Sequence, residues 1–499
     1  MSTDSAPAPA PTLRRDLGLL GLTATGICSM MGAAINVIPF MLQKSVPGIG
    51  PWVVPAYALA ALPAVLAALA YAMLASAMPR SGGSYIYASR AIGPYVGFVA
   101  SFSQWFGLSI AIGVVSYVIT PFLRDIAEAV GWTGIATTLE QRPVRLAMAL
   151  LFLWTFVLIN LRGIDLYERT LIPLMVAMFV LGGIVIVAGF SHTQSDFAAG
   201  LLAKEGRAVP VAPDAPWRWS VILAACPVLF SSFIGFDSIA QAGGEAKDPH
   251  RLLPRATFLA VGVVGTFYLL FAAAVYHAVP WAFIADEAQR RDITAPGLFG
   301  YFLSPGWTVA IVTGAACALT NDLPAMLLAV SRLMFAWAED GIMPRRIAAI
   351  HARWRTPHIA LLLSGGMATL GILGSHFAGS FFLGVDILVT AMLVNFLCMC
   401  WSVLALPARN PAIARAVRVL PQRGAQVAVA GAGLVLLAVL LTMHTWRDLT
   451  QPVAAWYYRS TPMWLAVMAI GSALYLRERR QTRASGLDLD ARFLALPPQ

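Results

Sequence analysis

The chain has 499 residues, of which 59% are hydrophobic and only 12% are charged, and its formal net charge is +10. A soluble globular protein carries about 25% charged residues, so this composition excludes one large soluble domain and indicates a polytopic membrane protein. The basic residues lie in short loops between apolar segments, as in membrane proteins, and we expect no nucleic-acid partner. The five cysteines fall in apolar runs without metal-site spacing, so we expect neither a metal site nor a cofactor.

Apolar segments of the length needed to cross a bilayer, about 20 residues, recur along the chain. The polar, Pro/Ala-rich stretch 1–16 precedes them and lacks the ordered parts of a signal peptide, so we expect it to remain as a cytoplasmic tail. The segments predict an all-α fold with about twelve transmembrane helices. The predicted spans are 17–43, 51–78, 91–122, 143–161, 169–190, 219–243, 254–279, 305–338, 357–374, 379–406, 424–444 and 461–476.

The loops between these spans alternate in charge. Lys and Arg residues on the N-terminal side of the membrane outnumber those on the other side by about two to one. This bias predicts that both termini are cytoplasmic, with residues 477–499 as a C-terminal tail. The expected location is the cytoplasmic (inner or plasma) membrane, in which the protein is multi-pass and surrounded by lipid.

Two of the predicted spans are interrupted by small and polar residues. The first contains SMMGAAINVIP (29–39), with Gly32 near its middle, and the sixth contains SSFIGFDSIAQAGGE (231–245), with Gly235. Either glycine alone also fits a close helix crossing. Interrupted helices at corresponding places in two halves of a chain are typical of transporters built from inverted repeats. The predicted units are a first repeat over 17–190, a second over 218–406 and two further helices over 424–476.

An interrupted helix leaves backbone N–H and C=O groups without partners. In hydrocarbon each such group costs several kcal/mol, so a break is tolerated only where water, protein or a ligand satisfies it. The half-helix after the break directs its positive dipole end at the gap, which suits a carboxylate. The half-helix before it offers free carbonyls, which suit an ammonium group or a cation. The two breaks therefore predict a binding site for a small amine or amino acid.

Four stretches resemble the amino acid–polyamine–organocation (APC) permease superfamily, in particular its cationic-amino-acid-transporter-like members. They are MMGAAINVIP (30–39), PRSGGSYIYASRAIGPYVGFVASFSQW (79–105), FSSFIGFDSIAQAGGEAKDPHRLLPRA (230–256) and SRLMFAWAEDGIMPRRIAAIHARWRTPHIALL (331–362). The resemblance implies a leucine-transporter-like five-plus-five inverted repeat, alternating access, and a substrate held between the first and sixth helices. By motif position it also implies substrate-binding groups at Met31, Gly32, Ala33, Ala34 and Ile35 on the carboxylate side, and at Ser231, Ser232, Phe233, Ile234 and Gly235 on the amine side.

Three features depart from the family pattern. Ala34 replaces a common glycine, and because alanine does not adopt positive φ cheaply, we expect a less open loop or weaker carboxylate binding. Asn36 stands where an apolar or aromatic residue is usual, and we expect its amide either to bond another helix or to touch the substrate. No lysine lies in 169–190, although some proton-coupled relatives carry one near the position of Met178, which puts coupling by that device in doubt.

Charged and amide side chains inside a membrane span are costly and usually functional. Asp237 follows the second break, Asp322 lies in ALTNDLPAM, and Asp386 lies in FFLGVDILVT. Each acid alternatively pairs with a hydroxyl, an amide or an arginine and only fixes packing. The predicted role of Asp237 is substrate contact, and Gln104 is predicted either to contact the substrate or to form an interhelical hydrogen bond. Ion coupling is predicted for Asp322, Thr320, Asn321 and Asp386, with binding of a substrate amine as the alternative for Asp322 and a place in the outer vestibule as the alternative for Asp386.

We therefore predict a secondary active transporter that moves an amino acid, cationic amino acids included, by alternating access, coupled to H⁺ or Na⁺. An amine or polyamine permease and an amino acid exchanger are the alternatives. A channel would need pore-lining rings or filter loops, which the sequence does not contain. A membrane enzyme would need a catalytic constellation; the sequence has no G-x-x-x-x-G-K-[ST] loop, and no catalytic residue is assigned. The sequence leaves the oligomeric state open.

Overall fold

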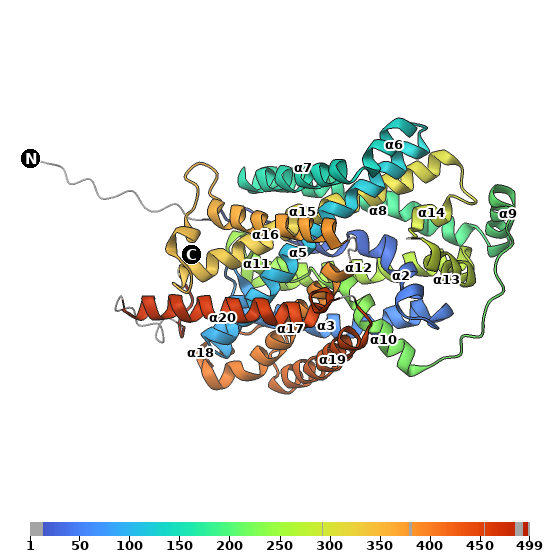
Figure 1. The fold of residues 1–499 in the computed structure, drawn as a ribbon. Helices are drawn as coiled ribbons and strands as arrows, with labels where there is room; N and C mark the ends of the chain where they lie inside the picture. The colour runs from blue at the N-terminus through green and yellow to red at the C-terminus, as the bar shows by residue number, and fades with distance from the viewer. Residues whose placement is uncertain (1–12, 292, 379–381, 454, 485–492, 498–499) are drawn as a thin grey trace, which may run out of the picture.

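The computed structural model describes residues 13–291, 293–378, 382–453, 455–484 and 493–497. This part of the chain consists of helices and the loops between them, with two isolated bridges, Leu17 to Ala246 and Ser81 to Ala242, as its strand-like pairings. Most of the long helices run between two ends of the molecule (Figure 1). The predicted all-α class is confirmed.

The long helical segments, in chain order, are α1 (Leu19–Met30), α2 (Ala33–Ser45), α3 (Val53–Ala77), α5 (Pro94–Ala129), α7 (Arg142–Leu161), α8 (Ile164–Ser191), α10 (Trp219–Phe230), α12 (Pro249–Ala278), α15 (Pro305–Glu339), α16 (His358–Ala378), α17 (Phe382–Arg409), α19 (Arg423–Thr450) and α20 (Ser460–Ala484). Shorter helices lie between them: α4 (Gly83–Ala91), α6 (Thr133–Glu140), α9 (Gln194–Glu205), α11 (Ser238–Gln241), α13 (Trp281–Arg290), α14 (Ala295–Phe299) and α18 (Pro411–Arg415).

Eleven helical segments among the described residues are long and apolar enough to cross a membrane. They correspond to the first eleven predicted spans. The twelfth predicted span, 461–476, lies within α20, which is not one of the eleven because its apolar part runs directly into the charged run Arg477–Arg480. The fifth span begins earlier than predicted, at Ile164, since Gly163 turns the chain with a φ of +102° and α8 then includes charged residues at its start.

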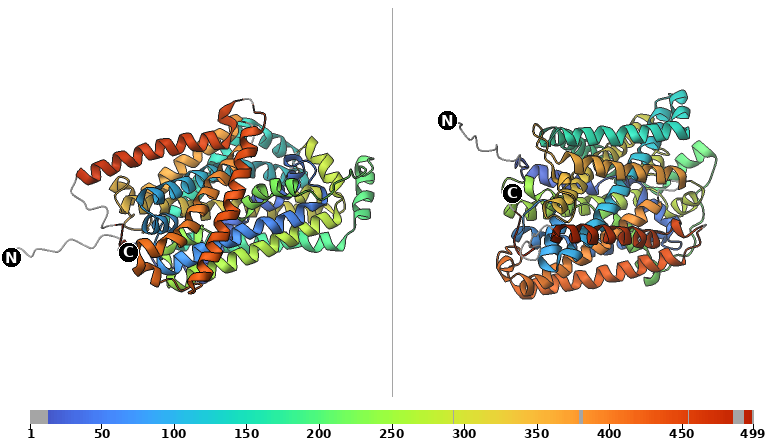
Figure 2. Two further views of the ribbon diagram at one scale, coloured as in Figure 1. Left: turned by 90° about the horizontal axis from the view of Figure 1, so that it is seen from below. Right: turned by 60° about the vertical axis from the view of Figure 1, so that its left-hand side comes forward.

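Different segments of the chain form the two ends of the molecule. Leu17, near the start of the described chain, pairs with Glu245 and Lys247 through backbone hydrogen bonds of 2.9 and 3.1 Å. Residues 493–497 lie on the same end, which we call the terminal face, whereas α9, α13 and α14 lie at the opposite face (Figures 1 and 2).

The first span lies at the centre of the bundle. In the most apolar stretch of this span, 100% is buried inside the protein. In the corresponding stretches of α7 and α8, only 28% and 22% are buried. Figure 1 shows α7 along one edge of the molecule and α19 along another. Since an apolar, exposed helix face in a membrane protein faces lipid, α7, α8 and α19 form the periphery and the first span is enclosed by protein.

The first span is broken between α1 and α2. Met31, with φ −91° and ψ 73°, and Gly32, with φ −112° and ψ −134°, leave the helical conformation. The carbonyl of Met30 at the end of α1 accepts a hydrogen bond of 2.5 Å from the Tyr268 hydroxyl of α12. A second irregularity follows in α2, because Pro39 has no N–H to offer the carbonyl of Ile35.

The sixth span is broken over a longer stretch. After α10, Ser231–Phe233 form one 3₁₀ turn, Ile234 is extended, and Gly235 has a φ of +137° before α11 begins. Gly235 packs directly on the first break: a methyl group on its Cα would lie 2.8 Å from the Met30 nitrogen and would collide with the Ser29 carbonyl. Beside this contact, the Ser29 and Ser238 hydroxyls are hydrogen-bonded at 2.8 Å. The two breaks therefore lie against each other.

Replacing Gly235 by alanine is expected to destabilise the protein. The backbone conformation alone costs a non-glycine residue on the order of 1–3 kcal/mol, and the added methyl group must also displace the first break. We expect a lower thermal unfolding temperature in detergent micelles. Gly183→Ala is the matched control, because Gly183 lies within α8 and has no other atom within 4 Å of the added methyl group. Equal unfolding temperatures for the two variants would show that the breaks are not in tight contact.

Candidate functional site

A cavity of about 710 Å³ begins at the two breaks and continues toward the opposite face. Ser29, Met30 and Gly32 line it from the first break, and Ser231 and Ile234 line it from the second. Arginines from three other segments lie toward the opposite face: Arg124, Arg145 and Arg291. The remaining walls are mainly apolar side chains of α2, α5, α15 and α17, including Val37, Ile38, Ala111, Val114, Val115, Phe122, Val312, Met326, Val385 and Leu388.

Asp322 of α15 is the acidic residue among the lining residues that the structure describes. Its side chain is buried, and its Oδ1 atom has no hydrogen-bond partner within the described part of the chain. The carboxylate packs against Gly32 so closely that a methyl group on the Gly32 Cα would overlap it. This position is the N-terminal end of α2, where the helix dipole stabilises a negative charge. Gly32 is therefore needed for contact with Asp322.

Thr320 and Asn321, which precede Asp322 in α15, make other contacts. The Thr320 hydroxyl donates to the Ala316 carbonyl at 2.7 Å, within its own helix. The Asn321 amide donates to the Cys28 sulfur at 2.7 Å, and its Oδ1 atom is buried without a partner among the described residues. Neither residue lines the cavity. The three predicted ion-coupling residues of α15 therefore point to different surroundings, and only Asp322 reaches the cavity.

Asp237 lies behind the second break and does not line the cavity. Its Oδ1 atom accepts a 3.2 Å hydrogen bond from the Gly235 N–H, and its Oδ2 atom accepts one from the Gln104 amide of α5. Gln241 extends the network, donating at 2.7 Å to the Ser84 hydroxyl and at 3.3 Å to Gln104. The carboxylate thus holds the Gly235 turn and ties it to α4 and α5, and Gln104 forms an interhelical hydrogen bond.

The other predicted substrate-binding residues divide into two groups. Gly32, Ser231 and Ile234 line the cavity, as described above. Phe233 instead packs between Tyr57 and Tyr268, with ring centroids 5.7 and 5.8 Å away. Residues buried around the breaks but outside the lining are Met31, Ile35, Asn36, Ser232 and Gly235, and the side chains of Ala33 and Ala34 lie outside what the structure describes.

Asn36 is buried on α2, and its amide makes no side-chain hydrogen bond to another described residue. It also does not line the cavity. The predicted hydrogen bond to another helix is therefore not made among the described residues, and the predicted contact with a substrate stays a prediction.

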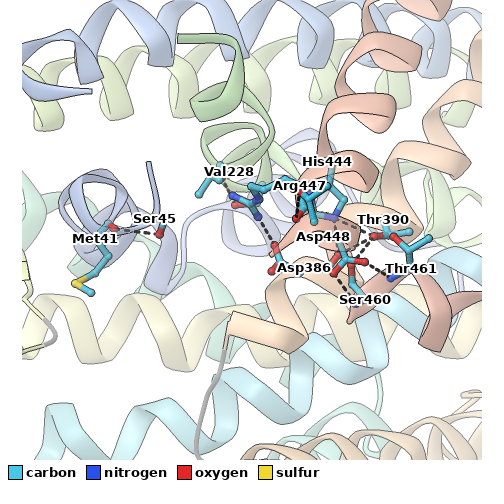
Figure 3. Close-up of polar contacts among 12 residues, drawn as sticks. Met41, Ser45, Val228, Asp386, Thr390, His444, Arg447, Asp448, Ser460 and Thr461 are labelled. Carbon is cyan, nitrogen blue, oxygen red and sulfur yellow. Dashed lines mark hydrogen bonds and ion pairs between the residues drawn. The ribbon is translucent and has the colours of Figure 1, made fainter. Parts of the chain in front are cut away.

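Asp386 faces away from the cavity, toward α19. Figure 3 shows its carboxylate beside Arg447, with Oδ1 at 2.7 Å from a guanidinium nitrogen. His444 lies 3.2 Å from the Asp386 carbonyl and 3.0 Å from the Thr390 hydroxyl. In the same cluster the carboxylate of Asp448 accepts hydrogen bonds from the first two N–H groups of α20 (Figure 3). The cluster joins α17, α19 and α20, and its neighbours Val385 and Leu388 are the residues of α17 that reach the cavity.

The lining residues that sequence reasoning missed are mostly apolar. Ser29 and Met30 lie directly before the predicted residues, so the break itself could have indicated them. The valines of α5 and the α17 residues Val385 and Leu388 lie in uniformly apolar helices, in which the sequence does not distinguish a lipid-facing side chain from a cavity-facing one. Their roles depend on helix rotation, which packing decides.

The terminal face is closed by two buried ion pairs. Arg332 of α15 lies 2.5 Å from Glu245, and both side chains are almost fully buried. Arg90 of α4 forms two hydrogen bonds to Asp340 at the end of α15, one of them 3.0 Å long. Burial opposes the charge on Arg90, but the hydrogen bond and the charge of Asp340 outweigh it and hold the pKa of Arg90 above its ordinary value. Below the breaks, the path to the terminal face is therefore blocked.

Replacing Glu245 by glutamine should leave the buried Arg332 guanidinium without its counter-charge. Removing one partner of a buried pair costs about 3–5 kcal/mol, so we expect a large drop in the thermal unfolding temperature in detergent micelles. Asp286→Asn is the control, because it breaks an ion pair with Arg290 in which both side chains are partly exposed, and such pairs contribute about 0.2–1 kcal/mol. Similar shifts for both variants would contradict the closure of the terminal face around Glu245.

Comparison with known proteins agrees with this architecture. The sequence profile of the family described as "Amino acid permease" matches residues 17–472. The chain is similar to the branched-chain amino acid permease BcaP of Bacillus subtilis, at 25% identity over 72% of this chain and 74% of that protein. It is also similar to cationic amino acid transporter 4 of Mus musculus, at 28% identity over 72% of this chain but only 55% of that longer protein.

A third relative, the methylthioribose transporter of Bacillus subtilis, is 25% identical over 96% of this chain and 97% of its own length. These relatives are all transporters, but they are named for different substrates. Because the family profile covers most of the chain, including both breaks, the protein belongs to the amino acid permease family of the APC superfamily and is a polytopic membrane transporter, not an enzyme.

Proposed function

We propose that this permease moves a zwitterionic amino acid with an apolar side chain by alternating access, with Asp322 binding the ammonium group. The observation that carries the proposal is the unpartnered, buried oxygen of Asp322 in an otherwise mainly apolar cavity, at the point where the two breaks meet. An ammonium group placed there would replace a missing hydrogen bond with a charge-assisted one.

The backbone around Asp322 supplies a partner for the substrate carboxylate. The N–H groups of the first turn of α2 have no intrahelical acceptors, and they follow directly after Gly32, which lines the cavity and whose own N–H is bonded to the Met30 carbonyl. The hydroxyls of Ser29 and Ser231 line the same region. Val37, Val114 and Leu388 supply apolar surface for a side chain. These groups together support an amino acid substrate with an apolar side chain, as in the branched-chain amino acids named for one relative.

A polyamine or a cationic amino acid is the second candidate, favoured by the cationic transporter among the relatives. A second positive charge would need a second acid in reach. Asp237, predicted from the sequence to contact the substrate, is bonded to Gly235 and Gln104 outside the lining, and Asp322 is the one acid among the described lining residues. The charge distribution therefore supports a substrate with one ammonium group.

For the coupling ion we propose H⁺. A sodium site needs several oxygen ligands that converge on one point, whereas Asp322 is the one carboxylate among the described lining residues and Thr320 and Asn321 lie outside the lining. A single carboxylate against a helix N-terminus suffices for a proton. Uptake would then require Asp322 to exchange a proton and the substrate ammonium group during the cycle.

We further propose that the terminal face is cytoplasmic, in the cytoplasmic membrane, in agreement with the excess of basic residues on that side. The cavity would then receive substrate from the outside. The first repeat, 17–190, and the second, 218–406, would move against each other to open the terminal face, with helices 424–476 at the periphery.

Transport into liposomes of defined lipid tests these proposals. We expect uptake of labelled leucine that rises when the liposome interior is made acidic, because each proton that leaves on Asp322 is exchanged for an entering substrate. We also expect competition by other apolar amino acids and little competition by arginine, putrescine or methylthioribose. Asp322→Asn removes a charge-assisted hydrogen bond of about 1.5–3 kcal/mol, so we expect affinity for leucine to fall about 10- to 100-fold.

Asp386→Asn is the matched control, because it is the same change in another span, outside the cavity lining, and its carboxylate bonds Arg447. Its affinity and pH-gradient dependence should match those of the unchanged protein. Putrescine as the strongest competitor would overturn the substrate class, and a Na⁺ gradient as the sole driving force would overturn proton coupling. Unchanged kinetics in Asp322→Asn would overturn the role of Asp322.

A further inference from the structure

A second cavity, of about 540 Å³, lies on the terminal face where α7 passes into α8. We call it the basic pocket; Arg162, Asp165, Leu166, Arg169, Arg353 and Trp354 line it. The first four residues come from the end of α7 and the start of α8, and the last two from the loop that precedes α16. Arg14, close to the start of the described chain, donates to Asp165 at 2.6 Å, which locates the pocket on the terminal face.

The charges of the basic pocket are not balanced. Its one acid, Asp165, is already paired with Arg14. Arg162, Arg169 and Arg353 form no ion pair with any residue that the structure describes, and all three are exposed. Three guanidinium groups around one cavity repel one another, and a bound anion would convert this repulsion into attraction. Guanidinium groups bind phosphate oxygens in a bidentate manner, which makes them the preferred residues for phosphate recognition.

The basic pocket also lies at the lipid boundary. The helices that form it, α7 and α8, are the least buried of the spanning helices together with α19. Figure 1 shows α7 at the edge of the bundle, with its end toward the terminal face. Trp354 is 37% exposed beside the arginines, and exposed tryptophans in membrane proteins lie at the level of the lipid headgroups.

We propose that the basic pocket binds the phosphate group of an anionic phospholipid, with the three arginines around the phosphate and the acyl chains along α7 and α8. The required chemistry is a phosphate ester anion, and its position at the bundle edge favours a lipid over a soluble phosphate. Basic pockets between spanning helices on one side of a membrane bind such headgroups in this way. Bound there, the lipid joins the first repeat to the loop that enters α16.

Native mass spectrometry of the full chain tests the proposal. The protein is released from liposomes of phosphatidylcholine alone or with phosphatidylglycerol, and the retained lipids are counted. We expect a variant carrying Arg162→Gln, Arg169→Gln and Arg353→Gln to retain one phosphatidylglycerol fewer than the unchanged protein. The control carries the same change at three other exposed arginines of the chain, Arg409, Arg415 and Arg418, and should retain the full number.

A third arm separates the two sources of phosphate. Inorganic phosphate is added to protein in phosphatidylcholine liposomes, and thermal unfolding is compared with that in phosphatidylglycerol. Stabilisation that depends on the three arginines and appears only with phosphatidylglycerol supports a lipid site. Arginine-dependent stabilisation by inorganic phosphate alone would overturn the lipid and leave a soluble anion site. Equal lipid retention in the variant and the control would overturn the site itself.

A separate set of contacts involves residues Phe493–Pro497, which we call the strap. Phe493 is only 1% exposed, and its ring lies 5.3 Å from the Arg90 guanidinium. The Arg90 Nε group also donates to the Ala495 carbonyl at 3.1 Å. The Asn410 amide donates to the Leu494 carbonyl at 2.9 Å, and Arg80 Nε donates to the Pro497 carbonyl at 2.9 Å.

The strap crosses the elements that close the terminal face. Arg80 precedes α4 and Arg90 lies in its last turn, Asn410 follows α17, and Arg90 in turn holds Asp340 at the end of α15. The strap therefore contacts one partner of this buried ion pair, Arg90, and also the segment just before α4 and the residue just after α17. Separation of α4 from the end of α17 would break the strap's contacts on one side or the other.

From these contacts we infer that the strap is a clasp that stabilises the closed state of the terminal face and must detach when that face opens. The inference rests on the proposed alternating access. We expect the strap to stabilise only the terminal face, because Arg80, Arg90 and Asn410, which bond it, do not line the cavity. A docked strap would slow the step in which the terminal face opens, and an undocked strap would allow it.

Hydrogen–deuterium exchange tests the clasp without any substrate, so its outcome is independent of whether the transport proposal holds. We expect Phe493→Ala to raise amide exchange in α4 and at the end of α15, and to leave α9 and α13 at the opposite face unchanged. Leu494→Ala is the matched control, because its side chain is 52% exposed and only its backbone carbonyl is used. Unchanged exchange in α4 for Phe493→Ala, or an equal rise for Leu494→Ala, would overturn the clasp.

Discussion

The structure depends on one constraint: a helix can be interrupted inside a membrane only if its freed backbone groups find partners. The two breaks meet this constraint largely by lying against each other. Gly235 has no side chain and therefore allows the second break to touch the Ser29 carbonyl, and Tyr268 satisfies the carbonyl of Met30. Two of the groups still without a described partner, the first N–H groups of α2 and Asp322 Oδ1, lie beside each other. The cavity opens at this point, so these unpartnered groups lie where there is space for a ligand.

Three membrane-embedded acids illustrate how tertiary contacts assign roles to identical side chains. Asp237 accepts bonds from Gly235 and Gln104 and thereby holds the turn of the second break. Asp386 pairs with Arg447 and joins the core to the peripheral helices. Only Asp322 keeps an oxygen without a described partner and lines the cavity. A carboxylate whose bonds are complete stabilises the fold, whereas an incomplete one is available to a ligand.

The two faces of the molecule differ in structure: one leads into the cavity, and the other is closed by buried ion pairs. The opposite face leads into a cavity, and its arginines surround an entrance with apolar walls. At the terminal face, buried pairs such as Arg332 with Glu245 leave no path, and the strap adds contacts to the Arg90–Asp340 pair. Desolvated pairs of this kind are costly to break one partner at a time but can separate together when water enters. Closure by ion pairs is therefore stable and still reversible.

Much of this architecture was predictable from the sequence. Apolar segment lengths predicted the spans, because the bilayer thickness sets them, and the glycine-interrupted stretches predicted the position of both breaks to within a few residues. The twelfth predicted span is not among the eleven helices long and apolar enough to cross a membrane, since α20 mixes an apolar half with a charged one. The shared family motifs indicated transport, which the family profile over residues 17–472 confirmed.

The sequence by itself determined the helical membrane fold, the two breaks and the family, because composition and glycine placement act locally along the chain. Only the tertiary structure decided which side chains meet. Asp237, Asp322 and Asp386 are equally conspicuous in the sequence, and the valines of α5 and α17 are equally inconspicuous. Their roles follow from the rotation and packing of whole helices, which bring residues hundreds of positions apart into contact, and no local pattern encodes that rotation.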